Sequence, residues 1–196
     1  MDVHQTPIGA PAPMILLAGL ILFGLLVLIR SGGAREEAGA KRSSLSVLGI
    51  AIQALSFFAV GFGRMTILYP APSPEALAQA GITLLLVAFT CGLFAASKYA
   101  LGRNWSVVAR TRADHELVTW GPFAYLRHPI YSALFVWLIA MAVAFGHYWG
   151  LIPAVPLYWV GTILRIREEE RLLRAQFGAD YEAYAKRVKR FVPGVI

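Results

Sequence analysis

The sequence predicts an all-α integral membrane protein, and its composition carries that prediction. Hydrophobic residues make up 58% of the 196 residues, whereas soluble domains average about 45–50%. Charged residues make up only 15% of the chain. The apolar residues are gathered in runs near the ~17–25 residues that a membrane-spanning helix needs. We therefore expect one membrane domain over residues 1–196.

Five spans are predicted, at about residues 13–29, 45–69, 79–99, 130–145 and 149–164. The second span contains two polar exceptions, Gln53 and Arg64. Only Gly146, His147 and Tyr148 separate the fourth span from the fifth. This short connection predicts that the last two spans form a helical hairpin.

The distribution of basic residues predicts the topology. Every lysine and arginine except Arg64 lies in the first loop, the third loop or the C-terminal tail of the five-span arrangement, if Lys98 at the end of the third span is counted with the third loop. These three segments share one side of the membrane. The positive-inside rule then places the N-terminus outside and the C-terminus in the cytoplasm. The membrane is expected to be a prokaryotic plasma membrane. Arg64 is expected near the outer interface, where it can snorkel.

Two polar segments, residues 100–131 and 165–196, face the cytoplasm under this topology. In the second of them, Gly178 is suited to ending a helix that continues from the fifth span. A further helix is expected at about 180–190, with Tyr181, Tyr184 and Val188 on its buried face. The basic cluster 186–190 is equally compatible with an amphipathic helix lying on anionic lipid.

Several classes of chemistry are excluded. The single cysteine, Cys91, cannot form a disulfide framework, and the scattered histidines have no metal-ligand spacing, so no metal is expected. Gly121 lacks the strand–turn–helix context of a soluble dinucleotide fold. The net charge of +7 is better explained by a membrane surface than by nucleic acid, because the basic residues flank apolar runs.

Two patterns in the polar segments have both a plain and a functional interpretation. Pro129 fits the first turn of the fourth helix, whose N-terminus presents free N–H groups suited to an anion. His128 would then cap that helix. Arg165 and Glu169 are four residues apart and share one helix face. A helix cap and a salt bridge would explain both patterns, and so would an inward-facing site.

The second half of the chain resembles the isoprenylcysteine carboxyl methyltransferase family, and its compact prokaryotic members most closely. The likeness covers roughly residues 98–196 and consists of several short motifs in order. They are Gly102-Arg103-Asn104-Trp105, His115-x-Leu117-Val118-x-x-Gly121, Arg127-His128-Pro129-x-Tyr131, Arg165-x-x-x-Glu169-Glu170, Phe177-Gly178-x-x-Tyr181-x-x-Tyr184 and Arg190-x-x-Pro193.

The resemblance implies a membrane methyltransferase that uses S-adenosylmethionine in a cytoplasmic pocket and acts on a lipophilic acceptor. The cofactor-binding positions it implies are His115, Glu116, Leu117, Val118, Phe123, His128, Pro129, Ile130, Tyr131 and Glu169. Phe123 stands where the family usually has tyrosine, so a hydroxyl hydrogen bond would be lost there. Arg165 matches the substrate-side arginine of the family, and Glu170 is the adjacent catalytic candidate.

The physical chemistry of methyl transfer agrees with these roles. The reaction requires the nucleophile and the methyl group in line at ~3–3.5 Å. A carboxylate nucleophile has a pKa near ~3.5 and needs no general base, and an arginine such as Arg165 can orient it through paired hydrogen bonds. The ring of Tyr131 or Tyr125 would face the sulfonium through cation–π contact.

Three alternatives remain open from the sequence. One is a membrane methyltransferase for a phospholipid amine or a small thiol, which would need a base. Another is an NADPH-dependent membrane reductase of the sterol-reductase type, with the cluster 186–190 binding a phosphate. The last is a non-enzymatic membrane protein with a basic tail. The oligomeric state is not predicted.

Overall fold

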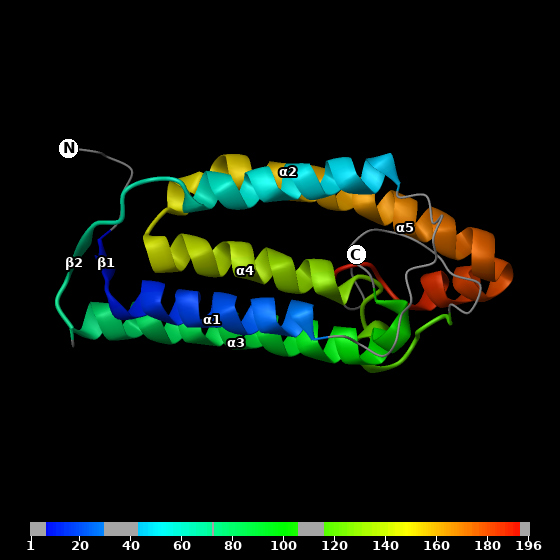
Figure 1. Cartoon of the computed structure of the whole chain (residues 1–196), viewed down its shortest axis with the longest axis horizontal. Coiled ribbons are helices and arrows are strands. Elements are labelled where there is room, and N and C mark those ends of the chain that lie inside the picture. Colours follow the sequence, from blue (N-terminus) through cyan, green and yellow to red (C-terminus); the bar gives the residue numbers. More distant parts are fainter. Residues whose placement is uncertain (1–6, 30–42, 72, 106–115, 193–196) are drawn as a thin grey trace.

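The computed structural model describes residues 7–29, 43–71, 73–105 and 116–192, and it is a bundle of five α-helices (Figure 1). The helices are α1 (Pro11–Leu28), α2 (Ser44–Gly61), α3 (Pro74–Leu101), α4 (Pro129–Phe145) and α5 (Leu151–Arg187). Short 3₁₀ turns occur at η1 (Gly102–Asn104), η2 (Gly121–Ala124) and η3 (Tyr148–Gly150). The prediction of an all-α membrane fold is confirmed.

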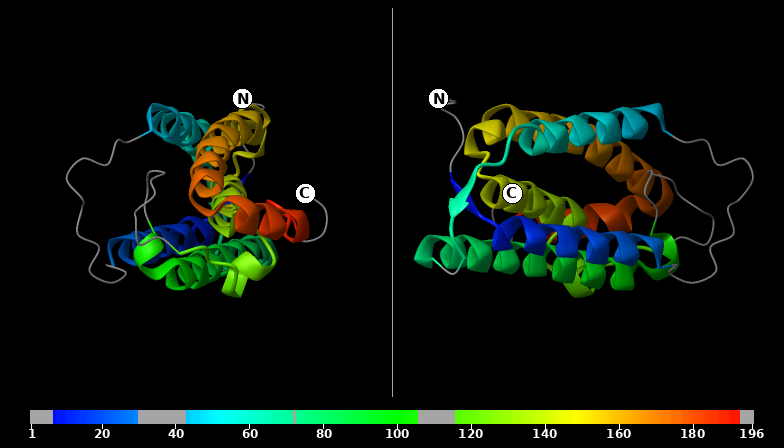
Figure 2. Two further views of the ribbon diagram at one scale, coloured as in Figure 1. Left: turned by 90° about the vertical axis from the view of Figure 1, so that its right-hand side faces the viewer. Right: turned by 60° about the vertical axis from the view of Figure 1, so that its left-hand side comes forward.

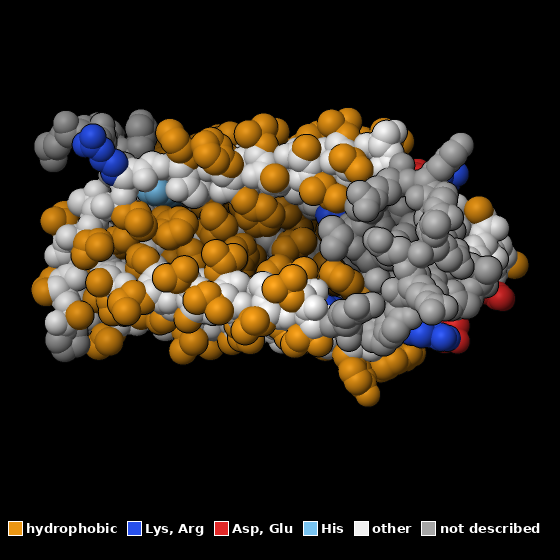
Figure 3. Space-filling model, viewed as in Figure 1, with side chains coloured by type: hydrophobic (Ala, Val, Ile, Leu, Met, Phe, Trp, Pro, Cys, Tyr) orange, Lys and Arg blue, Asp and Glu red, His pale blue; other side chains and the backbone are white. Residues whose placement is uncertain are grey.

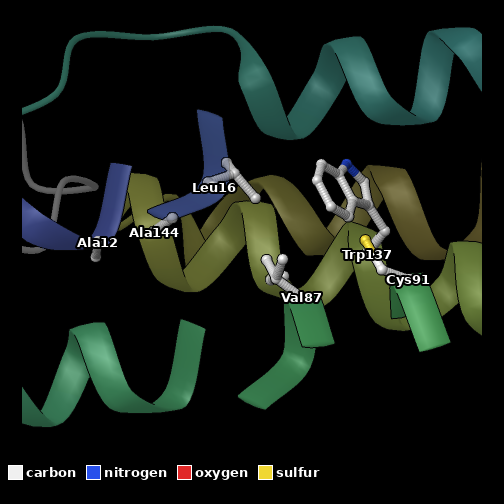
Figure 4. Packing of buried hydrophobic residues seen from close by; sticks show 7 residues of the cluster. Ala12, Leu16, Val87, Cys91, Trp137 and Ala144 are labelled. Carbon is white, nitrogen blue, oxygen red and sulfur yellow. The ribbon is translucent and has the colours of Figure 1, made fainter. Parts of the chain in front are cut away.

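Helix α4 lies at the centre of the bundle, between the pair α2–α5 and the pair α1–α3 (Figures 1 and 2). One of its faces carries Trp137, Ala140 and Ala144, which pack against α1 and α3 (Figure 4). The opposite face carries Leu138 and Ala142, which pack against α2 and α5. Small residues such as alanine allow helix backbones to approach closely. Helices in lipid associate through such close packing, because burial of apolar surface drives their association little there.

The outer surface of the bundle is suited to lipid. Large apolar side chains of α1, α2 and α3 are exposed along its length (Figure 3). Four of the described helices are long and apolar enough to span a membrane: α1, α2, α3 and α5. The fifth, α4, is apolar but has 17 residues. The apolar runs therefore form the predicted helices, and the helix between α3 and α5 is the shortest.

The predicted second span, 45–69, is wrong at its C-terminal end. Helix α2 stops at Gly61, and Gly63 has a φ of +141°, which a helix cannot accommodate. The chain continues to strand β2 (Ile67–Tyr69), which pairs in parallel with strand β1 (Ile8–Gly9). Arg64 lies beyond the helix and is exposed. We call this end of the bundle, with β1, β2 and η3, the strand end.

The hairpin of the last two spans is confirmed. Gly146 adopts a left-handed conformation, with a φ of +69°, at the C-terminus of α4, and η3 leads into α5. The part of α5 that precedes a kink at Gly178 is about 40 Å long, which exceeds the ~30 Å hydrocarbon core. The C-terminal part of α5 is therefore expected to extend beyond the bilayer.

The expected helix end at Gly178 is confirmed as a kink. Gly178 has a φ of +49°, outside the helical region, and the chain turns there and runs back toward α4 (Figures 1 and 2). The last helical segment ends at Arg187 rather than near residue 190. We call this end of the bundle, which comprises η1, residues 116–128 and residues 165–192, the polar end.

Candidate functional site

The tail is hydrogen-bonded to the connector that leads into α4. The backbone N–H of Arg127 donates to the carbonyl of Lys189 at 2.8 Å, and that of His128 donates to the carbonyl of Arg190 at 3.0 Å. Leu126 and Lys189 form a parallel bridge. Two segments about 60 residues apart in the sequence thus form one wall of the polar end.

Phe191 extends this wall into the bundle. Its carbonyl accepts a hydrogen bond from the Ser132 hydroxyl at 3.2 Å, in the first turn of α4. Its ring contacts Trp159 of α5 edge-on, with centroids 4.7 Å apart, and lies 6.2 Å from the His128 ring. The tail therefore covers the place where α4 begins.

Glu170 is the centre of a cluster of cations. Arg190 donates from Nε and Nη2 to its two carboxylate oxygens at 2.9 and 2.8 Å. Arg174 donates from Nη2 at 3.2 Å, and Nη2 of Arg127 lies 3.7 Å away. His128 Nε2 lies 3.2 Å from Oε1. The Glu170 side chain is only 1% exposed, whereas those of Arg190 and Arg174 are about half exposed. A buried carboxylate thus meets several cations, and we call this group the Glu170 cluster.

His128 lies between two carboxylates. Its Nε2 faces Glu170, and its Nδ1 is 3.6 Å from Oε2 of Glu169. Burial disfavours protonation of the imidazole, but the hydrogen bonds and charges of Glu169 and Glu170 outweigh it and raise the pKa of His128. The ring therefore connects the Glu170 cluster to Glu169, which is more exposed.

Tyr131, Glu169 and Arg165 form a second group, next to His128. The Tyr131 hydroxyl donates a hydrogen bond to Oε1 of Glu169. The guanidinium carbon of Arg165 lies 5.0 Å from the centroid of the Tyr131 ring. The Tyr158 hydroxyl donates to the backbone carbonyl of Tyr131 at 2.5 Å, which fixes the first turn of α4 against α5. An anion, a cation and an aromatic ring thus meet where α4 and α5 leave the apolar bundle.

Arg165 is also bound by α2. Its Nη1 donates to Oε1 of Gln53 at 2.9 Å, and Gln53 Nε2 donates to Oγ1 of Thr162 at 2.7 Å. Gly49 lies where any side chain would clash with Arg165, because an added Cβ would be 2.5 Å from its Cγ. The backbone of α2 is therefore in direct contact with Arg165.

The segment before η2 is attached to the end of α3. The side-chain amide of Asn104 donates to the backbone carbonyl of Glu116 at 3.2 Å and accepts from its N–H at 3.5 Å. Leu117 and Val118 follow and are half-buried, whereas Glu116 is exposed. The Asn104 of the Gly102–Trp105 motif thus positions the chain that leads to the predicted cofactor residues.

Phe123 connects η2 to the tail. Its side chain is buried, and its backbone carbonyl accepts a hydrogen bond from the Tyr184 hydroxyl at 2.7 Å. Gly121, with a φ of +61°, begins η2 in a conformation that favours glycine. The contact between η2 and the tail thus uses the backbone carbonyl of Phe123 rather than a side-chain hydroxyl.

The structure brings five of the predicted site residues into mutual contact: His128, Tyr131, Arg165, Glu169 and Glu170. Pro129 is buried and Ile130 is half-buried in the same first turn of α4. Glu116, Leu117, Val118 and Phe123 belong to the neighbouring segment at the end of α3. His115 lies outside the described residues.

Three residues with defined roles at this end were not predicted as site residues. Gln53 binds Arg165, Arg190 binds Glu170, and Lys98 is buried in α3 with Nζ donating to the carbonyls of Val27 and Ile29 at 2.9 and 2.6 Å. Lys98 thereby caps the C-terminus of α1. The available signal was the cost of placing polar groups such as Gln53 and Lys98 inside apolar helices.

Within the described residues, no group of three or more His, Cys, Asp or Glu side chains could hold a metal ion. The fold and the site define a helical membrane protein with a charged, partly buried site at one end of its bundle. Residues 81–175, which include α4 and most of α5, match the model of the isoprenylcysteine carboxyl methyltransferase family.

The matched relatives are named as methyltransferases. The protein-S-isoprenylcysteine O-methyltransferase of Schizosaccharomyces pombe is 34% identical over 94 residues, which are 47% of this chain and 40% of that protein. The enzyme of the same name from Dictyostelium discoideum is 37% identical over 96 residues, 48% of this chain and 40% of its own length.

The human protein of that name is 35% identical over 112 residues, which are 56% of this chain and 39% of that protein. The chain thus spans less than half the length of these relatives. The family match includes His128, Tyr131, Arg165 and Glu169, whereas helices α1 and α2 lie outside it.

Proposed function

We propose that this protein transfers a methyl group to the carboxylate of a lipid-modified, isoprenylcysteine-like acceptor at the membrane surface. The observation that carries the proposal is the contact of Arg165, Tyr131 and Glu169 at the polar end of α4 and α5. At such a place a soluble cofactor would arrive from the aqueous side and a lipophilic acceptor from the bilayer.

The residues at this site fit S-adenosylmethionine. Glu169 offers a carboxylate that is 27% exposed, suited to an ammonium or hydroxyl group. The first turn of α4 presents N–H groups suited to a carboxylate, and the Tyr131 ring suits a sulfonium cation. When bound, this cofactor supplies an electrophilic methyl group. We assign its binding to His128, Pro129, Ile130, Tyr131 and Glu169, together with the segment His115–Val118 and Phe123.

Arg165 is the group we assign to the acceptor. A guanidinium pairs with a carboxylate through two parallel hydrogen bonds, which fixes the plane of the nucleophile as well as its position. A carboxylate is ionised at neutral pH, so the site needs no general base. The positive charge of Arg165 attracts a carboxylate and repels a protonated amine. It therefore favours a carboxylate acceptor over an amine acceptor.

Glu170 was predicted as a catalytic residue, and its surroundings support a different contribution. Its carboxylate accepts hydrogen bonds from Arg190 and Arg174 and is only 1% exposed. We propose that Glu170 is a positioning residue, which keeps His128 and the tail against α4.

We propose that the polar end faces the cytoplasm of a prokaryotic cell. The basic residues of the first loop, the third loop and the tail support this orientation through the positive-inside rule. The strand end, with an exposed Arg64, would then lie outside.

The proposal is tested by methyl transfer from tritiated S-adenosylmethionine to N-acetyl-S-farnesylcysteine, with the protein in detergent or nanodiscs. The matched control acceptor is the carboxamide of the same compound, which has the prenyl chain but no carboxylate. We expect base-labile label in the acid alone, and an Arg165→Ala variant should lose most of that activity. Label in an amine lipid, or turnover of NADPH with no methyl transfer, would overturn the proposal.

A further inference from the structure

Gln53 is a buried polar side chain that the proposed reaction has not yet used. It lies in α2, with 4% of its surface exposed. Its amide uses both ends, accepting from Arg165 Nη1 at 2.9 Å and donating to Thr162 Oγ1 at 2.7 Å. A polar residue inside a membrane-spanning helix is costly and is retained mainly where it has a function.

The helices α2 and α5 are packed closely enough to force this contact. An added Cβ at Gly161 would lie 2.7 Å from the carbonyl oxygen of Gly49 and 2.9 Å from Cγ of Gln53. An added Cβ at Gly49 would lie 2.5 Å from Cγ of Arg165. Two glycines on facing helices therefore allow the Gln53 amide to reach Arg165 along a defined direction.

Resting on the function proposed above, we propose that Gln53 is a positioning residue, which orients the Arg165 guanidinium toward the anionic group of the methyl acceptor. An amide accepts the Nη1 hydrogen bond without bringing a negative charge to the arginine. A glutamate of the same shape would accept the same bond and also compete with the acceptor's carboxylate. This assigns a part of acceptor recognition to α2, outside the family-matched residues 81–175.

A purely structural role for Gln53 makes a different prediction. If Gln53 only joined α2 to α5, its loss would weaken charged and uncharged acceptor analogues alike, together with the cofactor. If it orients Arg165, its loss should weaken only ligands that carry the carboxylate. The discriminating measurement is therefore a comparison of an acid with its carboxamide.

The experiment measures three quantities for full-length wild type, Gln53→Leu and Gln53→Glu: the KM of N-acetyl-S-farnesylcysteine, the Ki of its carboxamide as a competitive inhibitor, and the Kd of S-adenosylhomocysteine. Ser56→Ala is the matched control. Ser56 is buried on the same helix, and its hydroxyl donates to the backbone carbonyl of Gln53 at 2.7 Å. Removing it deletes a buried hydroxyl of α2 without touching Arg165.

For Gln53→Leu we expect the KM of the acid to rise about tenfold, the size of a lost hydrogen bond to a charged group. The Ki of the carboxamide and the Kd of S-adenosylhomocysteine should stay within about twofold of wild type, and Ser56→Ala should change none of the three. Gln53→Glu should raise the KM of the acid in the same way, because Thr162 can donate its hydroxyl proton to a carboxylate there.

An unchanged KM in Gln53→Leu, or equal losses for the acid and the carboxamide, would overturn the assignment. If Gln53→Leu does not fold, Gln53→Glu decides the question by the same comparison. A wild-type protein that binds S-adenosylhomocysteine but methylates no acid would overturn the proposed acceptor, and the role of Gln53 with it. An active wild type with an indifferent Gln53 would overturn the role of Gln53 alone.

Discussion

Arg190 donates two hydrogen bonds to Glu170, from Nε to Oε1 at 2.9 Å and from Nη2 to Oε2 at 2.8 Å. This pair joins the last described residues of the chain to the part of α5 that lies in the polar end. Because the backbone carbonyl of Arg190 also accepts from His128, the pair fixes the wall of the site at the start of α4. The order of this wall should therefore depend on one ion pair.

Replacing Arg190 with alanine should release the tail. Glu170 keeps Arg174, Arg127 and His128 as partners, so we expect a loss of about 1–2 kcal/mol in the free energy of unfolding and faster proteolysis after residue 187. Arg171→Ala is the control, because Arg171 makes a similar two-bond contact to Glu168 with a side chain that is 64% exposed. Its loss should leave the unfolding transition nearly unchanged, because an ion pair on the surface contributes little. Equal effects of the two variants would contradict the role of Arg190.

Substitutions of the adjacent residues Glu169 and Glu170 should affect different properties, namely cofactor binding and stability. Glu170→Gln removes a buried carboxylate charge that faces the largely buried Arg127 and His128, so we expect a loss of about 3 kcal/mol of stability. Glu169→Gln should leave the fold nearly intact and weaken S-adenosylhomocysteine about tenfold. Thermal unfolding and calorimetric titration of both variants check this. A stable Glu170→Gln protein with no activity would instead support the catalytic role first predicted for that residue.

The stability of the polar end should depend on pH through His128. Its folded pKa is raised by Glu169 and Glu170 despite burial, whereas the unfolded value is about 6.5. Protonation therefore stabilises the fold fully below about pH 6.5, and this contribution is lost as pH rises through the folded pKa. Unfolding midpoints of wild type and His128→Gln, measured from pH 6 to pH 9, should converge as pH rises. If the difference between the two unfolding midpoints were constant over this range, His128 would not be stabilised in its protonated form.

The contact between α2 and α5 should be sensitive to a single methyl group. Gly161→Ala places a Cβ 2.7 Å from the Gly49 carbonyl oxygen, so we expect about 1–3 kcal/mol of destabilisation and a weaker acceptor interaction. Gly92→Ala, on α3, is the control, because an added Cβ there meets nothing within 4 Å. It should be neutral or slightly stabilising. Unfolding in detergent, followed by tryptophan fluorescence, compares the two, and equal curves would refute the close packing.

Hydropathy predicted the helices well, because a spanning helix is a local property of some 20 residues. It failed at 62–69, where the chain leaves α2 to form β2. The partner of β2 is β1, near the N-terminus, and no local pattern reveals a strand pair formed across such a distance. The same limit explains Lys98, which was counted as a loop charge and is buried against the C-terminus of α1.

The motifs of the second half predicted the residues of the candidate site but not all of their contacts. His128, Tyr131 and Glu169 meet as expected. The carboxylate of Glu170 accepts hydrogen bonds from Arg190, which is 20 residues away in the sequence. Arg165 and Gln53 are in contact although 112 residues separate them. Such pairs depend on how α2 and the tail are packed, which is a tertiary property that a single sequence does not display.

The most direct test of the account is calorimetric titration of the detergent-solubilised protein with S-adenosylhomocysteine and, separately, with NADPH. We predict saturable binding of S-adenosylhomocysteine, weakened by Glu169→Gln, and no binding of NADPH. Binding of NADPH without binding of S-adenosylhomocysteine would contradict the assignment of a methyl-donor site to Tyr131, His128 and Glu169.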